Sequence, residues 1–156
     1  MVEGDFEASL ARARKLTLAV MGSVVLMAPM SWWIFLDTHE KSFSWGSAFT
    51  IGVTVVAVAA PFVPALFFNR RPLEWWVRRS SGEPDASAAL LSQAYFGFRF
   101  YQAPAALGFL LMMGGASWFH GVSLMAVALL ALVINFPRRG RWAEALTQAG
   151  VPRVVS

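Results

Sequence analysis

The 156-residue chain contains no cysteine, and only 14% of its residues carry a charge. The absence of cysteine excludes disulfide bonds, thiol catalysis and cysteine-ligated metal sites. Soluble domains carry about 25% charged residues, so the chain is poor in charge by that standard. It is also 57% hydrophobic and has a positive mean hydropathy, which indicates an integral membrane protein. A disordered tail, a collagen-like repeat and a secreted disulfide scaffold are excluded.

Four apolar runs predict membrane-spanning helices, because a crossing helix needs about 20 apolar residues. Residues 16–36 and 47–68 contain no charge, a third span is expected at about 100–119, and a shorter fourth at 122–136. The fourth covers only about 22 Å of a roughly 30 Å core, so it has to gain length or lie where the bilayer is thin. A buried helix pair in a soluble core is the alternative, and two long uncharged runs argue against it.

Basic residues are distributed unevenly between the predicted loops, and this distribution predicts the orientation. The N-terminal segment, the middle loop and the C-terminal tail carry nearly all of them, whereas the two outer loops carry only Lys41. Both termini are therefore expected in the cytoplasm. Acidic residues precede the basic ones at the N-terminus, and the apolar run after them is too long for a signal peptide, so the first span is expected to be retained.

These predictions give an all-α fold, an integral membrane four-helix bundle built as two transmembrane helical hairpins. Residues 1–15 form a cytoplasmic N-terminal segment, with the pattern of an amphipathic helix on the membrane surface. Residues 16–136 form the transmembrane domain, with a tight outer loop around His120 and Gly121. Residues 137–156 form a cytoplasmic tail, within which a short interfacial helix is expected from Arg141 onwards.

Polar groups inside spans are costly and therefore mark candidate sites. No Asp, Glu, Lys or His lies within a predicted span, and the one charge near a span is Arg99, with Gln102 three residues later on the same helix face and Tyr101 beside them. These three residues are a candidate polar site that grips a lipid headgroup or a carboxylate of a partner. The alternative is that Arg99 reaches the inner headgroups while Gln102 bonds a neighbouring backbone.

Small residues follow along the third span at Pro104, Gly108 and Gly115. Small side chains let helix backbones approach closely, so this span is expected to pack against another helix, either in the same chain or in a second copy. Pro29 in the first span and Pro61 and Pro64 in the second each tend to kink the helix, because proline removes a backbone hydrogen bond. The kink predicted in the second span lies near its cytoplasmic third. Such a kink either opens a cavity beside Gln102 or serves packing alone.

The chain has few residues suited to catalysis or to binding a metal or cofactor. The two histidines, His39 and His120, fall in predicted outer loops, where a haem cannot be held between spans. A metal site shared by them would need a third ligand, such as Asp37 or Glu40, and no metal is expected. No nucleophile, base and acid occur together in a span, so no enzyme activity and no cofactor are expected. The basic residues are explained by membrane orientation, so no nucleic-acid partner is expected.

The segment from Arg99 to Leu111, RFYQAPAALGFLL, resembles the inner helix of the proteolipid subunits (c and K type) of rotary ATPases. The double-hairpin plan resembles duplicated proteolipids, and the whole chain is similar in pattern to uncharacterised small four-span membrane proteins of bacteria, including a terminal Phe136-Pro137-Arg138. The resemblance implies a bacterial inner membrane. It departs at Gln102, where a proteolipid carries its proton-binding carboxylate, so rotor function is not implied.

The function expected from these features is a non-enzymatic accessory or scaffold protein of the inner membrane, which packs against itself or a larger membrane complex. The alternative is a proteolipid-like transporter or channel component, in which Arg99 and Gln102 line a polar path. A third reading, a membrane enzyme subunit whose site is completed by a partner, has no residue in the sequence that specifies it.

Overall fold

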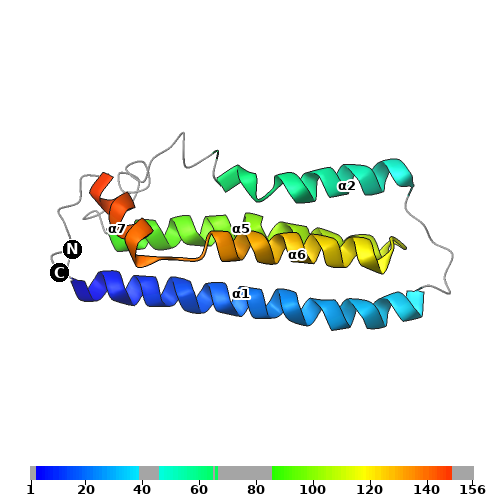
Figure 1. The fold of residues 1–156 in the computed structure, drawn as a ribbon, viewed down its shortest axis with the longest axis horizontal. Coiled ribbons are helices and arrows are strands. Elements are labelled where there is room, and N and C mark those ends of the chain that lie inside the picture. The colour runs from blue at the N-terminus through cyan, green and yellow to red at the C-terminus, as the bar shows by residue number, and fades with distance from the viewer. Residues whose placement is uncertain (1–2, 39–45, 65, 67–85, 149–156) are drawn as a thin grey trace.

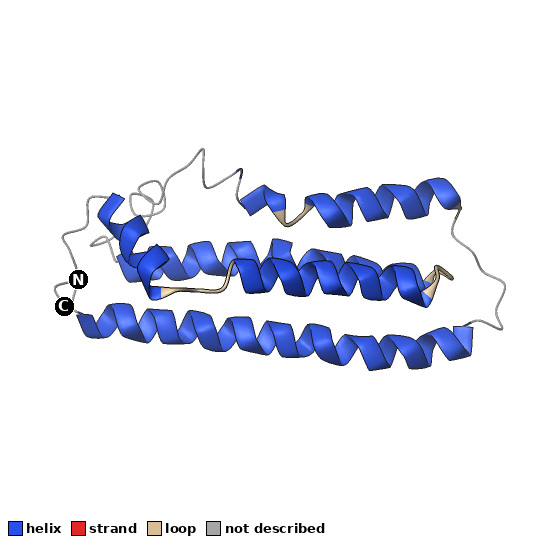
Figure 2. Cartoon of the chain, in the orientation of Figure 1, coloured by secondary structure: helices blue, strands red, loops and turns tan. Residues whose placement is uncertain are grey.

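The computed structural model describes residues 3–38, 46–64, 66 and 86–148, and every regular element in these ranges is a helix (Figure 2). The expected all-helical class is thereby confirmed for this part of the chain. The helices are α1 (Glu3–Thr38), α2 (Ser47–Ala59), α5 (Ala86–Met113), α6 (Trp118–Ile134) and α7 (Arg139–Gln148).

The four longer helices run side by side along the long axis of the molecule (Figure 1). Helices α5 and α6 form the central pair and make the most extensive contact in the fold. Helix α1 packs along one side of this pair and α2 along the other, while the short α7 lies at the end where α1 begins. The core of the bundle is therefore built around α5 and α6.

Helix α1 is a single helix of 36 residues, about 54 Å long at 1.5 Å per residue. It joins the expected cytoplasmic segment, residues 1–15, and the expected first span without a break. Phe6, Leu10 and Ala13 are buried at the spacing of one helix face. The N-terminal segment is thus amphipathic, but its apolar face packs on the rest of the protein instead of lying on a membrane surface.

The contact between α5 and α6 depends on two glycines. A Cβ atom on Gly108 would lie 2.8 Å from the carbonyl oxygen of Gly121, and a Cβ atom on Gly121 would collide with the side chain of Met112. Glycine at position 108 therefore lets the α5 backbone approach the α6 backbone closely, and glycine at position 121 leaves space for the Met112 side chain. The small residue at position 108 serves a contact within the chain.

Helix α5 ends at a glycine cap. Gly115 has a φ of 87°, in the left-handed region that favours glycine, and the amide N–H of Ala116 donates to the carbonyl oxygen of Leu111 at 2.9 Å. Ser117 then caps α6, because its side chain accepts a hydrogen bond from the amide of His120 at 3.3 Å. The tight connection lies at residues 114–117, and the expected loop position around His120 is wrong, since His120 belongs to the first turn of α6.

Helix α2 is interrupted where prolines were expected to kink it. The helix ends at Ala59, a turn covers Ala60 and Pro61, and residues 62–64 are helical again. Thr54 of α2 and His120 of α6 share a hydrogen bond of 2.8 Å between Oγ1 and Nε2. This bond fixes α2 to the central pair near the end opposite α7.

Within the described residues, one helical segment, Phe6–Trp33, is by itself long and apolar enough to cross a membrane. Helices α6 and α7 meet the same criterion only together, and they are bent by 62° relative to each other. Helix α2 is apolar but has only 13 residues. One or two described helices are therefore suited to a membrane, which is weak support for membrane association.

We predict that Gly108→Ala destabilises the protein whereas Gly22→Ala does not. The first substitution forces α5 and α6 apart, at a cost of about 1–3 kcal/mol. The second meets no atom within 4 Å and removes a helix-destabilising glycine, for a gain of about 0.5–1 kcal/mol. Thermal unfolding of the two purified variants in detergent micelles measures the difference. Equal melting temperatures would contradict the tight packing of α5 on α6.

Candidate functional site

The corner between α6 and α7 gives this end of the molecule its shape. Helix α6 ends at Ile134, its C-cap Asn135 donates from Nδ2 to the carbonyl oxygen of Ala131 at 2.9 Å, and α7 begins at Arg139. Pro137 follows the end of α6, where proline is common because it cannot continue a helix. The chain therefore turns through 62° instead of extending straight out of the bundle.

Three arginines hold this corner in place. Arg14 of α1 donates from Nε to the carbonyl oxygen of Pro137 at 3.2 Å. Arg141 donates from Nη1 to the carbonyl oxygen of Ile134 at 3.1 Å, and Arg139 pairs with Glu7 of α1 at 2.9 Å. Ile134 is the last residue of α6, where carbonyl groups lack intrahelical partners and carry partial negative charge, so the guanidinium group of Arg141 suits this position. The corner is thus tied both to α6 and to α1.

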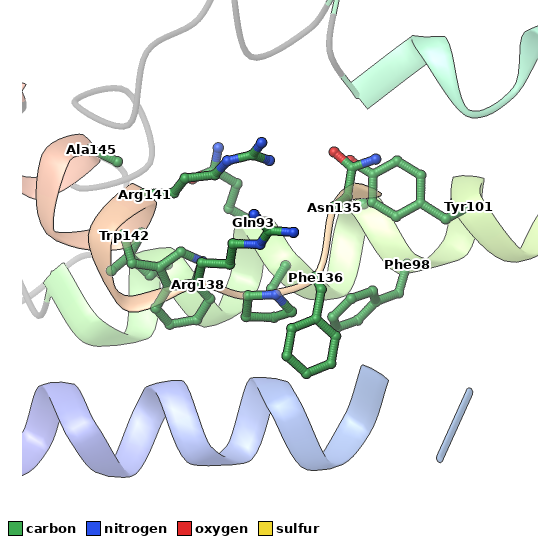
Figure 3. A pocket seen from close by; sticks show the side chains of 13 residues that line it. Gln93, Phe98, Tyr101, Asn135, Phe136, Arg138, Arg141, Trp142 and Ala145 are labelled. Atoms are coloured by element: carbon green, nitrogen blue, oxygen red, sulfur yellow. The ribbon is translucent and has the colours of Figure 1, made fainter. Parts of the chain in front are cut away.

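A pocket of about 230 Å³ lies between this corner, the first half of α5 and α7 (Figure 3). Asn135 and Tyr101 lie towards one end of it, and Trp142 and Ala145 towards the other. The pocket is lined by Leu90, Gln93, Ala94, Gly97, Phe98, Tyr101, Asn135, Phe136, Pro137, Arg138, Arg141, Trp142 and Ala145.

Helical spacing explains why these residues meet. On α5 the lining residues recur every three or four positions from Leu90 to Tyr101, which is one helix face. On and before α7 the same spacing relates Arg138, Arg141 and Ala145. Gly97 leaves space for the ring of Tyr101, because a Cβ atom at position 97 would lie 3.1 Å from that ring.

The chemistry of the lining is that of a site for an anion with an organic part. Arg138 and Arg141 supply two guanidinium groups, and Gln93 and Asn135 supply two amides. Tyr101 and other aromatic rings form apolar walls. No carboxylate lines the pocket among the residues that the structure describes. A guanidinium offers five N–H donors in a planar fork that matches carboxylate and phosphate groups.

Of the three polar residues predicted to form a site, Arg99, Tyr101 and Gln102, only Tyr101 lines the pocket. Tyr101 is buried and lines the pocket. Arg99 is exposed and Gln102 is half-buried, and neither of them lines the pocket. The sequence-predicted site thus contributes one residue to the pocket.

The three small residues predicted for the third span do not share one role. Pro104 and Gly108 are buried within α5, and Gly108 meets α6. Gly115 is exposed and lies in the turn after α5, so it ends the helix instead of extending its packing surface. Helix α5 begins at Ala86, well before the expected start of the third span. Gln102 does not line the pocket, so the pocket is not the cavity that is one of the two alternatives for the proline kink.

Sequence reasoning missed the residues that make the pocket basic. Arg138, Arg141 and Trp142 were assigned to membrane orientation and to an interfacial helix. The signal that identifies them is their spacing: positions 138, 141, 142 and 145 share one helix face, as do 90, 94, 97 and 101 on α5. Which two faces meet depends on the 62° corner, which the sequence does not specify.

Metal ligation is not supported by the described residues, which contain no group of three His, Asp or Glu side chains suited to a metal ion. His120 is engaged with Thr54 of α2. His39 lies outside the residues that the structure describes.

Comparison with known proteins gives no relative of this chain: no protein-family model, no curated protein and no solved structure matches it. Its function therefore has to be argued from its own residues.

We predict that Arg14→Gln loosens the corner. Loss of the Nε hydrogen bond leaves the Pro137 carbonyl without its partner on α1, so the amides at the start of α7 are expected to exchange hydrogen faster by about fivefold or more, equivalent to about 1 kcal/mol. Hydrogen–deuterium exchange measured by mass spectrometry over residues 138–148 tests this. Arg12→Gln is the matched control, because Arg12 is an exposed arginine on the same helix. Equal exchange in both variants would contradict the bracing role of Arg14.

Proposed function

We propose that this chain is a multi-pass protein of the bacterial inner membrane, with four spans and both termini in the cytoplasm. In this proposal it is a non-enzymatic accessory or scaffold component, which packs against a second copy of itself or against a larger membrane complex. The lipid bilayer is then its main surrounding, and the resemblance to small four-span bacterial proteins accords with this assignment.

The basic residues at one end of the bundle support the proposed orientation. Arg12, Arg14 and Lys15 of α1 and the basic corner before α7 lie at the same end, joined by the contacts of Arg14 with Pro137 and of Glu7 with Arg139. Basic residues favour the cytoplasmic side. Helix α6, at 17 residues, is about 26 Å long, close to the roughly 30 Å core of a bilayer.

One observation carries the scaffold proposal: the outward faces of α1 and α2 carry glycine within an apolar surface. Cβ atoms built on Gly22 and on Gly52 meet no atom within 4 Å. Leu18 and Leu26, one turn to either side of Gly22, are 58% and 65% exposed. Lipid alone requires only apolar side chains, whereas a glycine on such a face lets a neighbouring helix approach closely. The outer helices thus have the surface of helices that pack on others.

The absence of cysteine makes this proposal directly testable. We expect Gly22→Cys or Gly52→Cys to form a disulfide-linked dimer when native membranes are oxidised, because these positions face outwards. Ala105→Cys is the control and should remain monomeric, since Ala105 is fully buried. Electrophoresis without reductant measures the products.

Native mass spectrometry of the wild-type chain, extracted in its own lipid, covers the case of a different partner. A defined larger assembly, with or without a cross-linked dimer, supports the scaffold proposal. A lone monomer in this measurement, together with no cross-link at position 22 or 52, would overturn it.

A second candidate function is a proteolipid-like transport component. It is favoured by the place of Tyr101, which lies between Arg99 and Gln102 in the sequence and lines a pocket that contains two arginines. This candidate predicts ion flux in liposomes that contain the purified chain, and a several-fold lower flux for Arg99→Ala. Liposomes that show no flux of protons, cations or anions would remove it.

A further inference from the structure

We propose that the pocket between α5 and α7 binds a phosphate ester, with its phosphate held by Arg138 and Arg141. This inference assigns a ligand to a site that the scaffold proposal does not use. It rests on the proposed membrane orientation only for the choice of a lipid as the first source of the phosphate.

The charge of the pocket selects an anion. Arg138 and Arg141 line it from the corner and from α7, and no carboxylate opposes them among the described lining residues. The hydrogen bond from Arg141 to the carbonyl oxygen of Ile134 uses one of the five N–H donors of that guanidinium and fixes the direction of the side chain. The remaining donors are available for a phosphate, which accepts paired hydrogen bonds from arginine.

The walls of the pocket select an organic phosphate over the bare ion. Phe98, Tyr101 and Trp142 contribute aromatic rings, and Gln93 and Asn135 contribute amides that can bond hydroxyl or ester oxygens. The volume of about 230 Å³ is several times the roughly 30 Å³ that a water molecule occupies in the liquid, so it has room for a phosphate and further atoms. The arginines thus suit the phosphate group, and the rings and amides suit the organic part of a phosphate ester.

The position of the pocket favours a lipid as the source. It lies at the end of the bundle where the basic residues of α1 and the α6–α7 corner gather, which is the cytoplasmic headgroup level in the proposed topology. Indole rings prefer this interfacial level, and Trp142 lines the pocket there. A soluble phosphate monoester shares the same chemistry and is the second source.

The test uses the full chain in detergent, titrated with phosphatidic acid and followed by native mass spectrometry. We expect one retained phosphatidic acid per chain, bound about tenfold more weakly by Arg138→Gln, because one charge-assisted hydrogen-bonding group is lost. Arg12→Gln removes the same charge from an exposed position of α1, and this variant should bind phosphatidic acid as the wild type does. Phosphatidylcholine in place of phosphatidic acid measures whether the anionic monoester is preferred.

A second pair of variants tests the space in the pocket without changing its charge. Ala145→Phe fills the pocket from α7 and should abolish retention, whereas Ala106→Phe adds the same ring to an exposed position of α5 and should not. Circular dichroism melting of each variant shows whether it is folded, and Arg138→Gln keeps the test valid where Ala145→Phe does not fold.

Equilibrium dialysis with glycerol 3-phosphate and with inorganic phosphate identifies the source. Binding of phosphatidic acid but of neither soluble compound assigns the pocket to a lipid headgroup. Binding of glycerol 3-phosphate at similar affinity assigns it to a soluble ester, and the proposal stands with that source. Equal losses in Arg138→Gln and Arg12→Gln, or no binding by the wild type, overturn the proposal. The cross-linking of Gly22→Cys is unaffected by either result, so failure of this inference and failure of the scaffold proposal are distinguishable.

Discussion

The close approach of α5 and α6 at Gly108 and Gly121 is the contact on which the other elements depend. Because Gly108 has no Cβ atom, the α5 backbone meets the α6 backbone at Gly121, where the missing Cβ atom also leaves space for the Met112 side chain, and each helix then offers its remaining sides to other elements. Helix α1 lies against both members of the pair and α2 lies mainly against α5. The short turn at residues 114–117 makes the pair an antiparallel hairpin, so the C-terminal end of α6 returns to the level at which α5 passes Tyr101.

Different interactions hold the helices together at the two ends of the bundle. At the end away from α7, Trp32 of α1 and Trp118 of α6 meet edge to face, with ring centroids 5.0 Å apart, and Thr54 bonds His120. At the other end, guanidinium groups bind backbone carbonyls and a carboxylate. Among the described residues, aromatic rings and the Thr54–His120 hydrogen bond connect the helices at the first end, whereas guanidinium groups lie at the second.

The sequence predicts the helical class well because apolar runs and helix periodicity are local properties, and it predicts the break near Pro61 because proline acts locally too. Gly115 shows the limit of this reasoning. A glycine in an apolar run is compatible both with a packing surface and with a helix end, and only the hydrogen bond from Ala116 to Leu111 decides between them. Arg141 shows the same limit at the site. The number of basic residues in the tail predicts the membrane orientation of the chain, but the direction of the Arg141 side chain depends on the corner between α6 and α7.

The pocket exists because α6 stops where it does. Pro137 cannot continue the helix, and the 62° turn brings α7 back over α5. A straight continuation would carry Arg138 and Arg141 away from Gln93 and Tyr101, and would leave this α5 face without the α7 residues that now oppose it. The long α1 prevents that outcome, because Arg14 holds the Pro137 carbonyl and Glu7 holds Arg139. The extension of α1 beyond its apolar run thus has a structural purpose: it holds in place the corner that forms the basic pocket.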